Sequence, residues 1–223
     1  FISNFIYNID NILMNLYYHK KHNLEVGLDE AGRGCLMGPV FTAAVIMNDI
    51  SDNPPPYEIK DSKKCNPEIR KELRKYIENN AIAYNVQQVS EKIIDKENIL
   101  KATMIGMHLC LDDITSIINI DRILVDGNYF PIYTDKHNFN SIPHVCIKGG
   151  DDKYLNIAAA SILAKEYRDE YITKLCEENE FLNKYDIRNN KGYGTKVHMD
   201  ALKQYGPTIF HRKSFKPCNN FEK

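Results

Sequence analysis

Carboxylates follow three separate apolar runs of this sequence. Asp29 and Glu30 end the first run, Asp126 ends the second, and Asp151 follows the third after a short glycine-containing turn. Acids that come from separate strand ends can converge at the carboxyl edge of an open α/β sheet. A cluster with a charge of about −4 is unfavourable by several kcal/mol unless cations bind to it. The pattern therefore predicts a cation site built from Asp29, Glu30, Asp126 and Asp151.

The expected ligands are all oxygen atoms, because no histidine or cysteine stands beside these acids. Oxygen ligands suit Mg²⁺ or Mn²⁺ and not Zn²⁺. Two such ions can activate a water molecule and stabilise the leaving oxygen of a phosphodiester. Taken singly, each aspartate is better explained as a cap or turn residue, so the prediction depends on their common position after apolar runs.

A glycine-rich corner, Gly32-Arg33-Gly34, follows the first acidic pair. Glycine lets backbone groups approach a ligand closely, and the guanidinium of Arg33 is a rigid fork of donors for phosphate or sugar oxygens. The alternative is a surface turn with solvated charges. Neighbouring residues on a strand point to opposite faces, so Asp29 and Glu30 can share an ion only if the strand bends there.

The elements that must position these residues follow from periodicity. Strands are expected over 24–30, 40–47 and 81–89, where apolar residues alternate, and they can form an antiparallel meander. Residues 122–126 and 144–147 are short apolar strands of the kind that pair in parallel in a buried sheet.

Helices are predicted between these strands. One begins after Asn66 as N-cap and runs to about Glu78, a long helical stretch runs from Ser90 or Asp95 to about Ile118, and a third covers about 153–177. Within the third, residues 157–161 are small enough for close packing against the sheet. A last helix has Thr195 as its N-cap and ends at Gly206-Pro207.

The predicted organisation has three parts: a helical extension at 1–23, a catalytic domain at 24–180 and a small C-terminal subdomain at 181–223. Apolar residues recur every three or four positions in the extension, which indicates an amphipathic helix. That helix is expected either to dock on the domain or to bind a partner.

The overall composition excludes little. The 223 residues carry a formal net charge of −1, which neither requires nor excludes a local basic surface for nucleic acid. The six cysteines are scattered without a C-x-x-C pair, which argues against a zinc site. No run reaches the roughly 18 apolar residues of a membrane span.

The chain resembles ribonuclease HII, the type 2 ribonucleases H, in its single-chain bacterial-like form. The motifs that carry the resemblance span most of the chain: LDEAGRGCLMGPV (28–40), DSKK (61–64), ENILKAT (97–103), LVDGN (124–128), IAAASILAK (157–165), NKGYGT (190–195) and HRKSF (211–215). The resemblance implies a ribonuclease H-like fold, with a mixed five-stranded sheet flanked by helices and a small helical C-terminal subdomain. It also implies a two-metal (Mg²⁺ or Mn²⁺) endonuclease that cuts on the 5′ side of ribonucleotides embedded in duplex DNA, leaving 3′-hydroxyl and 5′-phosphate ends.

The same resemblance assigns roles to individual residues. Asp29, Glu30, Asp126 and Asp151 match the metal-binding acids of the family, and Asp151 is preferred over Asp152 because it lies six residues before Ile157. The inserted glycine in Lys148-Gly149-Gly150 departs from the family pattern and keeps Asp152 as the alternative. The remaining candidate substrate contacts are the 2′-hydroxyl-sensing Gly32, Arg33 and Gly34, the junction-stacking Tyr193, and Lys63, Lys64, Thr195 and Arg212.

The expected partners are RNA–DNA hybrids and DNA that contains single ribonucleotides, with no membrane. The protein is expected to be a monomer, and a replication-clamp contact through a terminal segment is a further hypothesis. An intracellular location is expected, cytoplasmic if the protein is bacterial-like and in an organelle if a leader precedes residue 1. Two rival functions remain: a type 1 ribonuclease H that needs a run of ribonucleotides, and a catalytically silent nucleic-acid-binding scaffold.

Overall fold

The computed structural model describes residues 24–221 of the chain. The helix predicted within residues 1–23 lies outside the described residues. No helix in the described range is long and apolar enough to cross a membrane.

A mixed five-stranded sheet forms the centre of the fold, as the sequence predicts. It contains β1 (Glu25–Ala31), β2 (Val40–Met47), β3 (Ala81–Val89), β4 (Arg122–Asp126) and β7 (His144–Ile147), in the spatial order β3-β2-β1-β4-β7. β1, β2 and β3 pair antiparallel, whereas β4 pairs in parallel with both β1 and β7. The parallel half brings the carboxyl ends of β1, β4 and β7 to one edge of the sheet.

β7 differs from the expectation of a buried strand. All four of its residues are only half-buried, because β7 is the edge strand of the sheet. A separate two-stranded ribbon, β5 (Tyr133–Thr134) with β6 (Ser141–Ile142), lies between β4 and β7 in the sequence.

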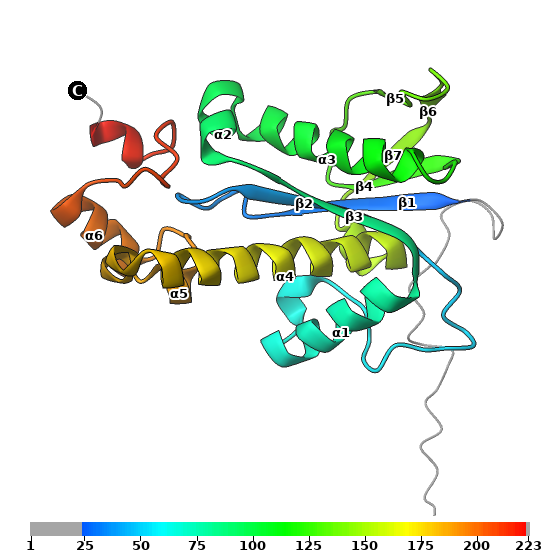
Figure 1. Ribbon diagram of the computed structural model, residues 1–223, viewed down its shortest axis with the longest axis horizontal. Helices are drawn as coiled ribbons and strands as arrows, with labels where there is room; N and C mark the ends of the chain where they lie inside the picture. The colour runs from blue at the N-terminus through cyan, green and yellow to red at the C-terminus, as the bar shows by residue number, and fades with distance from the viewer. Residues whose placement is uncertain (1–23, 222–223) are drawn as a thin grey trace, which may run out of the picture.

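Helices cover both faces of the sheet (Figure 1). α2 (Glu91–Glu97) and α3 (Ile99–Thr115) lie on one face, and α1 (Pro67–Asn80) and α4 (Leu155–Glu178) lie on the other. β2 is buried along its whole length, so its alternate side chains contribute to two cores. Ala44 and Ile46 pack into the α3 side, and Ala43 and Val45 into the α4 side.

Close contact between α4 and β1 depends on small residues, as the run at 157–161 predicts. Those five residues are almost completely buried. A side chain at Gly27 of β1 would overlap the backbone of Asn156 and Ile157. The buried amide of Asn156 closes the contact, since it donates to Glu25 O (2.6 Å) and accepts from Met47 N (2.9 Å). The start of α4 is thereby fixed against β1 and β2.

The long helical stretch expected from Ser90 or Asp95 to about Ile118 is divided into two helices. The chain breaks at Asn98, whose φ of 69° is left-handed, and α3 ends at Thr115. The Asn98 side chain accepts a hydrogen bond from Lys101 N (3.1 Å), so Asn98 acts as the N-cap of α3. Asparagine tolerates left-handed backbone better than most residues, which allows the break without glycine or proline.

The chain after residue 180 is helical and packs at one end of the sheet. It contains η4 (Glu180–Tyr185), α5 (Ile187–Asn190), α6 (Lys196–Tyr205) and η5 (Cys218–Phe221). Thr195 caps α6, as predicted, because its hydroxyl accepts from His198 N (3.4 Å). These elements share one apolar cluster with Leu36, Met37 and the end of α4. The predicted boundary at residue 180 stays a prediction.

Candidate metal and nucleic-acid site

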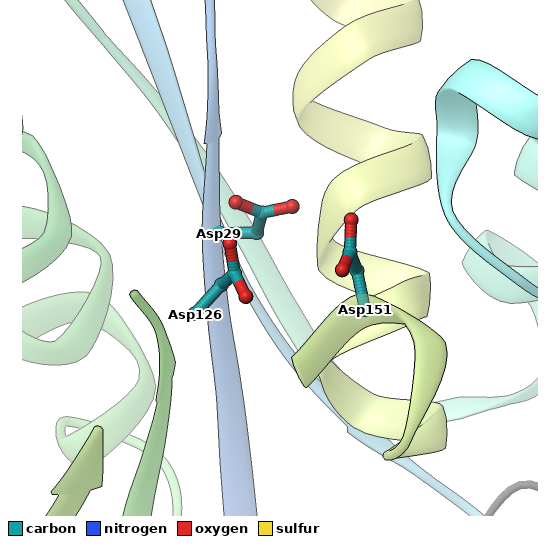
Figure 2. Close-up of side chains that lie close together, drawn as sticks. All are labelled: Asp29, Asp126 and Asp151. Atoms are coloured by element: carbon teal, nitrogen blue, oxygen red, sulfur yellow. The ribbon is translucent and has the colours of Figure 1, made fainter. Parts of the chain in front are cut away.

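Three aspartates from separate elements meet at the carboxyl edge of the sheet. Asp29 comes from β1, Asp126 from the end of β4, and Asp151 from the 3₁₀ turn η3 (Gly150–Asp152) before α4. Each offers a carboxylate oxygen within 4.8 Å of the other two, and Figure 2 shows the three groups turned toward a common point. Three oxygen ligands so close together fit a divalent cation.

Asp29 is the most deeply placed of the three, at 5 % exposure. Burial and the negative charges of Glu30 and Asp126 raise its pKa well above the ordinary value. A hydrogen bond from the Ser161 hydroxyl favours the ionised form, and the Ser62 and Ser161 hydroxyls lie 3.0 Å apart. The site thus holds a carboxylate whose charge is poorly compensated by the protein.

The inserted glycine of Lys148-Gly149-Gly150 has a structural role. Gly149 adopts left-handed φ and ψ angles of 61° and 44°, which turns the chain sharply after β7. Gly150 N then donates to Asp126 Oδ1 at 2.7 Å. This turn directs Asp151 inward, where burial and the charge of Asp126 raise its pKa to about 6.

The neighbouring Asp152 points away from the cluster. Its exposed carboxylate accepts from Lys64 Nζ at 2.6 and 2.7 Å. Asp151 and Asp152 therefore have different environments, and the structure brings only Asp151 to Asp29 and Asp126.

Glu30 is not brought into the same group. β1 keeps an unshifted register with β2 through Asp29, Glu30 and Ala31, and the three carboxylate oxygens that lie within 4.8 Å of one another do not include one from Glu30. The strand bend expected at the acidic pair stays a prediction. The Glu30 carboxylate instead accepts from Arg33 Nη1 at 3.3 Å. Burial raises the pKa of Glu30, and the Arg33 charge lowers it in part. Glu30 lies beside the cluster, paired with the arginine of the glycine corner.

The corner itself has one constrained and one open glycine. Gly32 has a φ of 93°, and a side chain there would overlap the guanidinium of Arg168. Gly34 has no atom within 4 Å of the position a Cβ would take, and it is exposed together with Arg33. The backbone at Gly34 is therefore accessible to a ligand.

Two buried arginines hold the segment that follows the corner. Arg168 donates to Pro39 O (3.2 Å), Met37 O (3.2 Å) and Lys191 O (2.9 Å), while Arg212 donates to Gly38 O (2.9 Å) and Arg33 O (2.9 Å). Arg212 is completely buried. The expectation that Arg212 contacts phosphate is therefore wrong, because its guanidinium is used inside the protein to bind backbone carbonyls.

Tyr193 belongs to a segment that is distant in the sequence from the glycine corner but lies beside it in the fold. Gly192 O accepts from Leu36 N at 2.8 Å, which fixes the two segments side by side. Tyr193 is 43 % exposed, and the buried Cys35 thiol donates to Lys191 O at 3.6 Å, two residues before it. Thr195 is exposed two residues further on. The corner and an accessible aromatic ring thus share one surface.

Lys63 and Lys64 belong to the exposed turn η2 (Ser62–Lys64). Burial lowers the pKa of Lys63, but the negative charges of four acids outweigh it and raise this pKa overall; the acids are Asp61, Asp29, Asp151 and Asp126. Lys64 is paired with Asp152, as described above. Lys63 therefore brings a positive charge next to the aspartate cluster.

Sequence reasoning missed the supporting residues of the site. The sequence indicated only a packing role for Ser161 and no role for Arg168. The signal for Arg168 was an arginine within a helix whose other face is apolar, but its carbonyl partners at Met37 and Pro39 are about 130 positions away.

Comparisons with known proteins identify relatives over most of the chain. The family model described as Ribonuclease HII matches residues 26–218. Proteins named Ribonuclease HII are 45 % identical over 202 residues in Parabacteroides distasonis (91 % of this chain, 94 % of that one) and 47 % over 205 residues in Christiangramia forsetii (90 % and 93 %). The RNase HII of Archaeoglobus fulgidus, solved in a complex with PCNA, is similar in structure with a TM-score of 0.66 and 25 % identity, covering 86 % of this chain and 95 % of that one.

Proposed function

The chain belongs to the ribonuclease HII family, and from this membership we propose that Asp29, Asp126 and Asp151 hold the divalent metal ions for cleavage of ribonucleotides in DNA. The protein is a metal-dependent endoribonuclease that acts on RNA–DNA hybrids. The observation that carries the assignment of the site is the approach of three carboxylates from three elements to within 4.8 Å.

The proposed reaction is hydrolysis of the phosphodiester on the 5′ side of a ribonucleotide in duplex DNA, which leaves 3′-hydroxyl and 5′-phosphate ends. Bound divalent ions supply a nucleophilic water and stabilise charge on the leaving oxygen. Glu30 is the proposed fourth ligand. To bind an ion, its carboxylate would give up the hydrogen bond from Arg33 and turn toward the aspartates. Mg²⁺ and Mn²⁺ both suit this set of oxygen ligands.

The chain's own residues prepare the site. Ser161 orients the Asp29 carboxylate, and Gly150 N orients that of Asp126. Burial and the clustered negative charge raise the pKa of Asp29 and of Asp151, so a cation that neutralises the cluster also favours the ionised ligands. Lys63 is the proposed contact for the phosphate nearest the metal site, because it lies within the field of the same aspartates. Lys64 would leave its ion pair with Asp152 to bind a phosphate of the substrate.

Recognition of the ribonucleotide is proposed for the corner and Tyr193. Exposed backbone at Arg33 and Gly34 can both donate to and accept from a 2′-hydroxyl, which is the group that distinguishes RNA from DNA. The half-exposed Tyr193 ring can stack on the neighbouring sugar. Thr195, also exposed, is the proposed third contact on this surface.

Two further proposals concern the cell. Since the Archaeoglobus relative was solved with PCNA, a contact with a replication clamp is proposed for this chain. An intracellular location is proposed because the substrate is DNA that contains ribonucleotides.

The test is Mg²⁺-dependent cleavage of a DNA duplex that carries one ribonucleotide, with both product ends mapped. We expect one cut on the 5′ side of the ribonucleotide and no cut in an all-DNA duplex. Asp151→Asn should lose this activity, whereas Asp152→Asn, its exposed neighbour, should retain it. Cleavage only within runs of ribonucleotides would instead favour type 1 specificity.

A further inference from the structure

Two buried histidines of the C-terminal region touch each other behind Tyr193. His198 lies on α6, His211 lies in the segment that follows α6, and both are at most 1 % exposed. Their Nε2 atoms are 2.9 Å apart. The outer nitrogens also have partners: His198 Nδ1 lies 2.9 Å from Tyr193 O, and His211 Nδ1 accepts from Thr208 N at 2.9 Å. The two rings thus form a continuous hydrogen-bonded chain from Thr208 to Tyr193.

The partners at the two ends determine where the protons lie. Tyr193 O can only accept, so His198 Nδ1 carries a proton, and Thr208 N can only donate, so His211 Nδ1 carries none. With both rings neutral, His211 Nε2–H donates to His198 Nε2, and every nitrogen has a complementary partner. Burial lowers the pKa of both rings, that of His211 to about 3. A third proton on the pair would have to bind His198 Nε2 or His211 Nδ1, and either nitrogen would then face another N–H donor.

This hydrogen-bonded chain of the two histidines connects the glycine corner with Tyr193, the two parts of the proposed ribose-recognition surface. The backbone of His211 forms a β-bridge with Met37, and Arg212 N donates to Leu36 O at 2.9 Å, in the segment that leaves the glycine corner. At its other end, His198 Nδ1–H holds the Tyr193 carbonyl, which also accepts from Thr195 N at 2.8 Å. Because the Tyr193 ring is half-exposed and only partly held by packing, the position of the Tyr193 backbone determines the position of the ring.

We propose that His198 and His211 are positioning residues, which hold Tyr193 at a fixed place relative to the Gly32–Gly34 corner and thereby determine selectivity for single ribonucleotides. Neither ring is exposed, so neither touches nucleic acid directly. This inference rests on the proposed role of Tyr193 in stacking on the junction sugar. Small displacements of a positioning group are sufficient to lower the rate of one substrate strongly.

The experiment is a double-mutant cycle with His198→Phe, Tyr193→Ala and the variant that combines them. The measured quantity is the ratio of kcat/KM for a duplex with one ribonucleotide to kcat/KM for a continuous RNA–DNA hybrid. His198→Phe should lower this ratio about tenfold. It should lower the ratio no further in the Tyr193→Ala background, because residues that act through one another are not additive.

Matched variants separate positioning from general destabilisation. Tyr185→Phe removes a hydroxyl that donates to Gly206 O (2.7 Å) in the same subdomain, but keeps the ring that packs on both histidines, so the ratio should not change. His198→Asn, whose amide N–H can take the place of Nδ1–H, should restore part of the ratio. If His198→Phe does not fold, His211→Phe removes the donor to His198 Nε2 at the other end of the chain and should also lower the ratio.

Amide hydrogen exchange of residues 190–196 adds a readout that does not depend on activity. Exchange there should be faster in His198→Phe than in the wild type and unchanged in Tyr185→Phe. Unchanged exchange in a folded His198→Phe variant, or fully additive effects in the cycle, would overturn the inference. If exchange rises as expected but Tyr193→Ala has the wild-type ratio, the positioning stands and the proposed role of Tyr193 has failed.

Discussion

Gly32 packs directly against the buried guanidinium of Arg168. The glycine leaves β1 with a φ of 93°, and a Cβ at this position would overlap the arginine side chain. The same guanidinium binds carbonyl oxygens of Met37, Pro39 and Lys191. One contact therefore links the glycine corner beside the aspartates to the segment that carries Tyr193.

Gly32→Ala should damage the protein, because it combines an unfavourable backbone angle with a steric overlap. We expect a loss of roughly 2–4 kcal/mol in the free energy of unfolding and a strong loss of cleavage. Gly34→Ala is the matched control, since the space around Gly34 is open, and its thermal stability should stay close to that of the wild type. Equal melting temperatures for the two variants would contradict the packing described for Gly32.

Arg168→Lys should also be destabilising although it conserves the charge. A lysine ammonium cannot reproduce the planar fork that reaches three carbonyl oxygens, and it would leave buried acceptors without donors. We expect a loss of roughly 3 kcal/mol in denaturant unfolding. Arg188→Lys alters an exposed pair with Glu177 and should leave the midpoint unchanged. A wild-type midpoint for Arg168→Lys would mean that the fork is dispensable.

The aspartate cluster should make the metal-free protein less stable as the pH rises. The folded-state pKa of Asp151, about 6, is above its unfolded value of about 3.9, so the folded state holds a proton that the unfolded chain releases. The resulting stabilisation is complete below about pH 4 and is lost as the pH rises to about 6.

Asp151→Asn removes this dependence, so it should stabilise the metal-free protein above pH 6 by roughly 1–3 kcal/mol. Melting curves of the wild type and the variant at pH 4.5 and 7.5, in EDTA, measure the difference. Added Mg²⁺ should stabilise the wild type at pH 7.5 and have little effect on the variant. A variant that is less stable than the wild type at pH 7.5 would contradict the prediction that the ionised Asp151 carboxylate destabilises the metal-free protein.

Tyr193→Ala should impair incision at a single ribonucleotide more than incision of a continuous hybrid. The reason is that the proposed contact is with the sugar at the junction, which a continuous hybrid does not require. Tyr205→Ala removes a comparably exposed ring at the end of α6 and should affect both substrates equally. Equal losses on both substrates for Tyr193→Ala would show that its role is structural.

The sheet and the convergence of the aspartates could be predicted from the sequence, because strand periodicity and the carboxyl-edge rule are local or topological. The break at Asn98 could not, since Glu97-Asn98-Ile99 has no glycine or proline to indicate the positive φ that Asn98 adopts. The sharing of one ion by Asp29 and Glu30 was an inference from chemistry, and in the structure the Glu30 carboxylate accepts from Arg33 instead.

Arg212 illustrates what a single sequence does not reveal about a charged residue. In HRKSF it stands in a basic and aromatic run, which is the usual composition of a phosphate-binding surface. Its actual partners are the carbonyl oxygens of Arg33 and Gly38, more than 170 positions away, and only the folded chain brings them together. The two histidines likewise become a pair only through the packing of α6.

The central claim is that Asp29, with Asp126 and Asp151, holds catalytic metal. The most direct measurement compares Asp29→Asn with the wild type for both cleavage and binding of a duplex with one ribonucleotide in Mg²⁺. We predict that cleavage falls by about 1,000-fold or more, equivalent to about 4 kcal/mol, because the site loses a ligand. Binding of the duplex and the melting temperature should change little. Turnover of Asp29→Asn at the wild-type rate would contradict the assignment of the metal site.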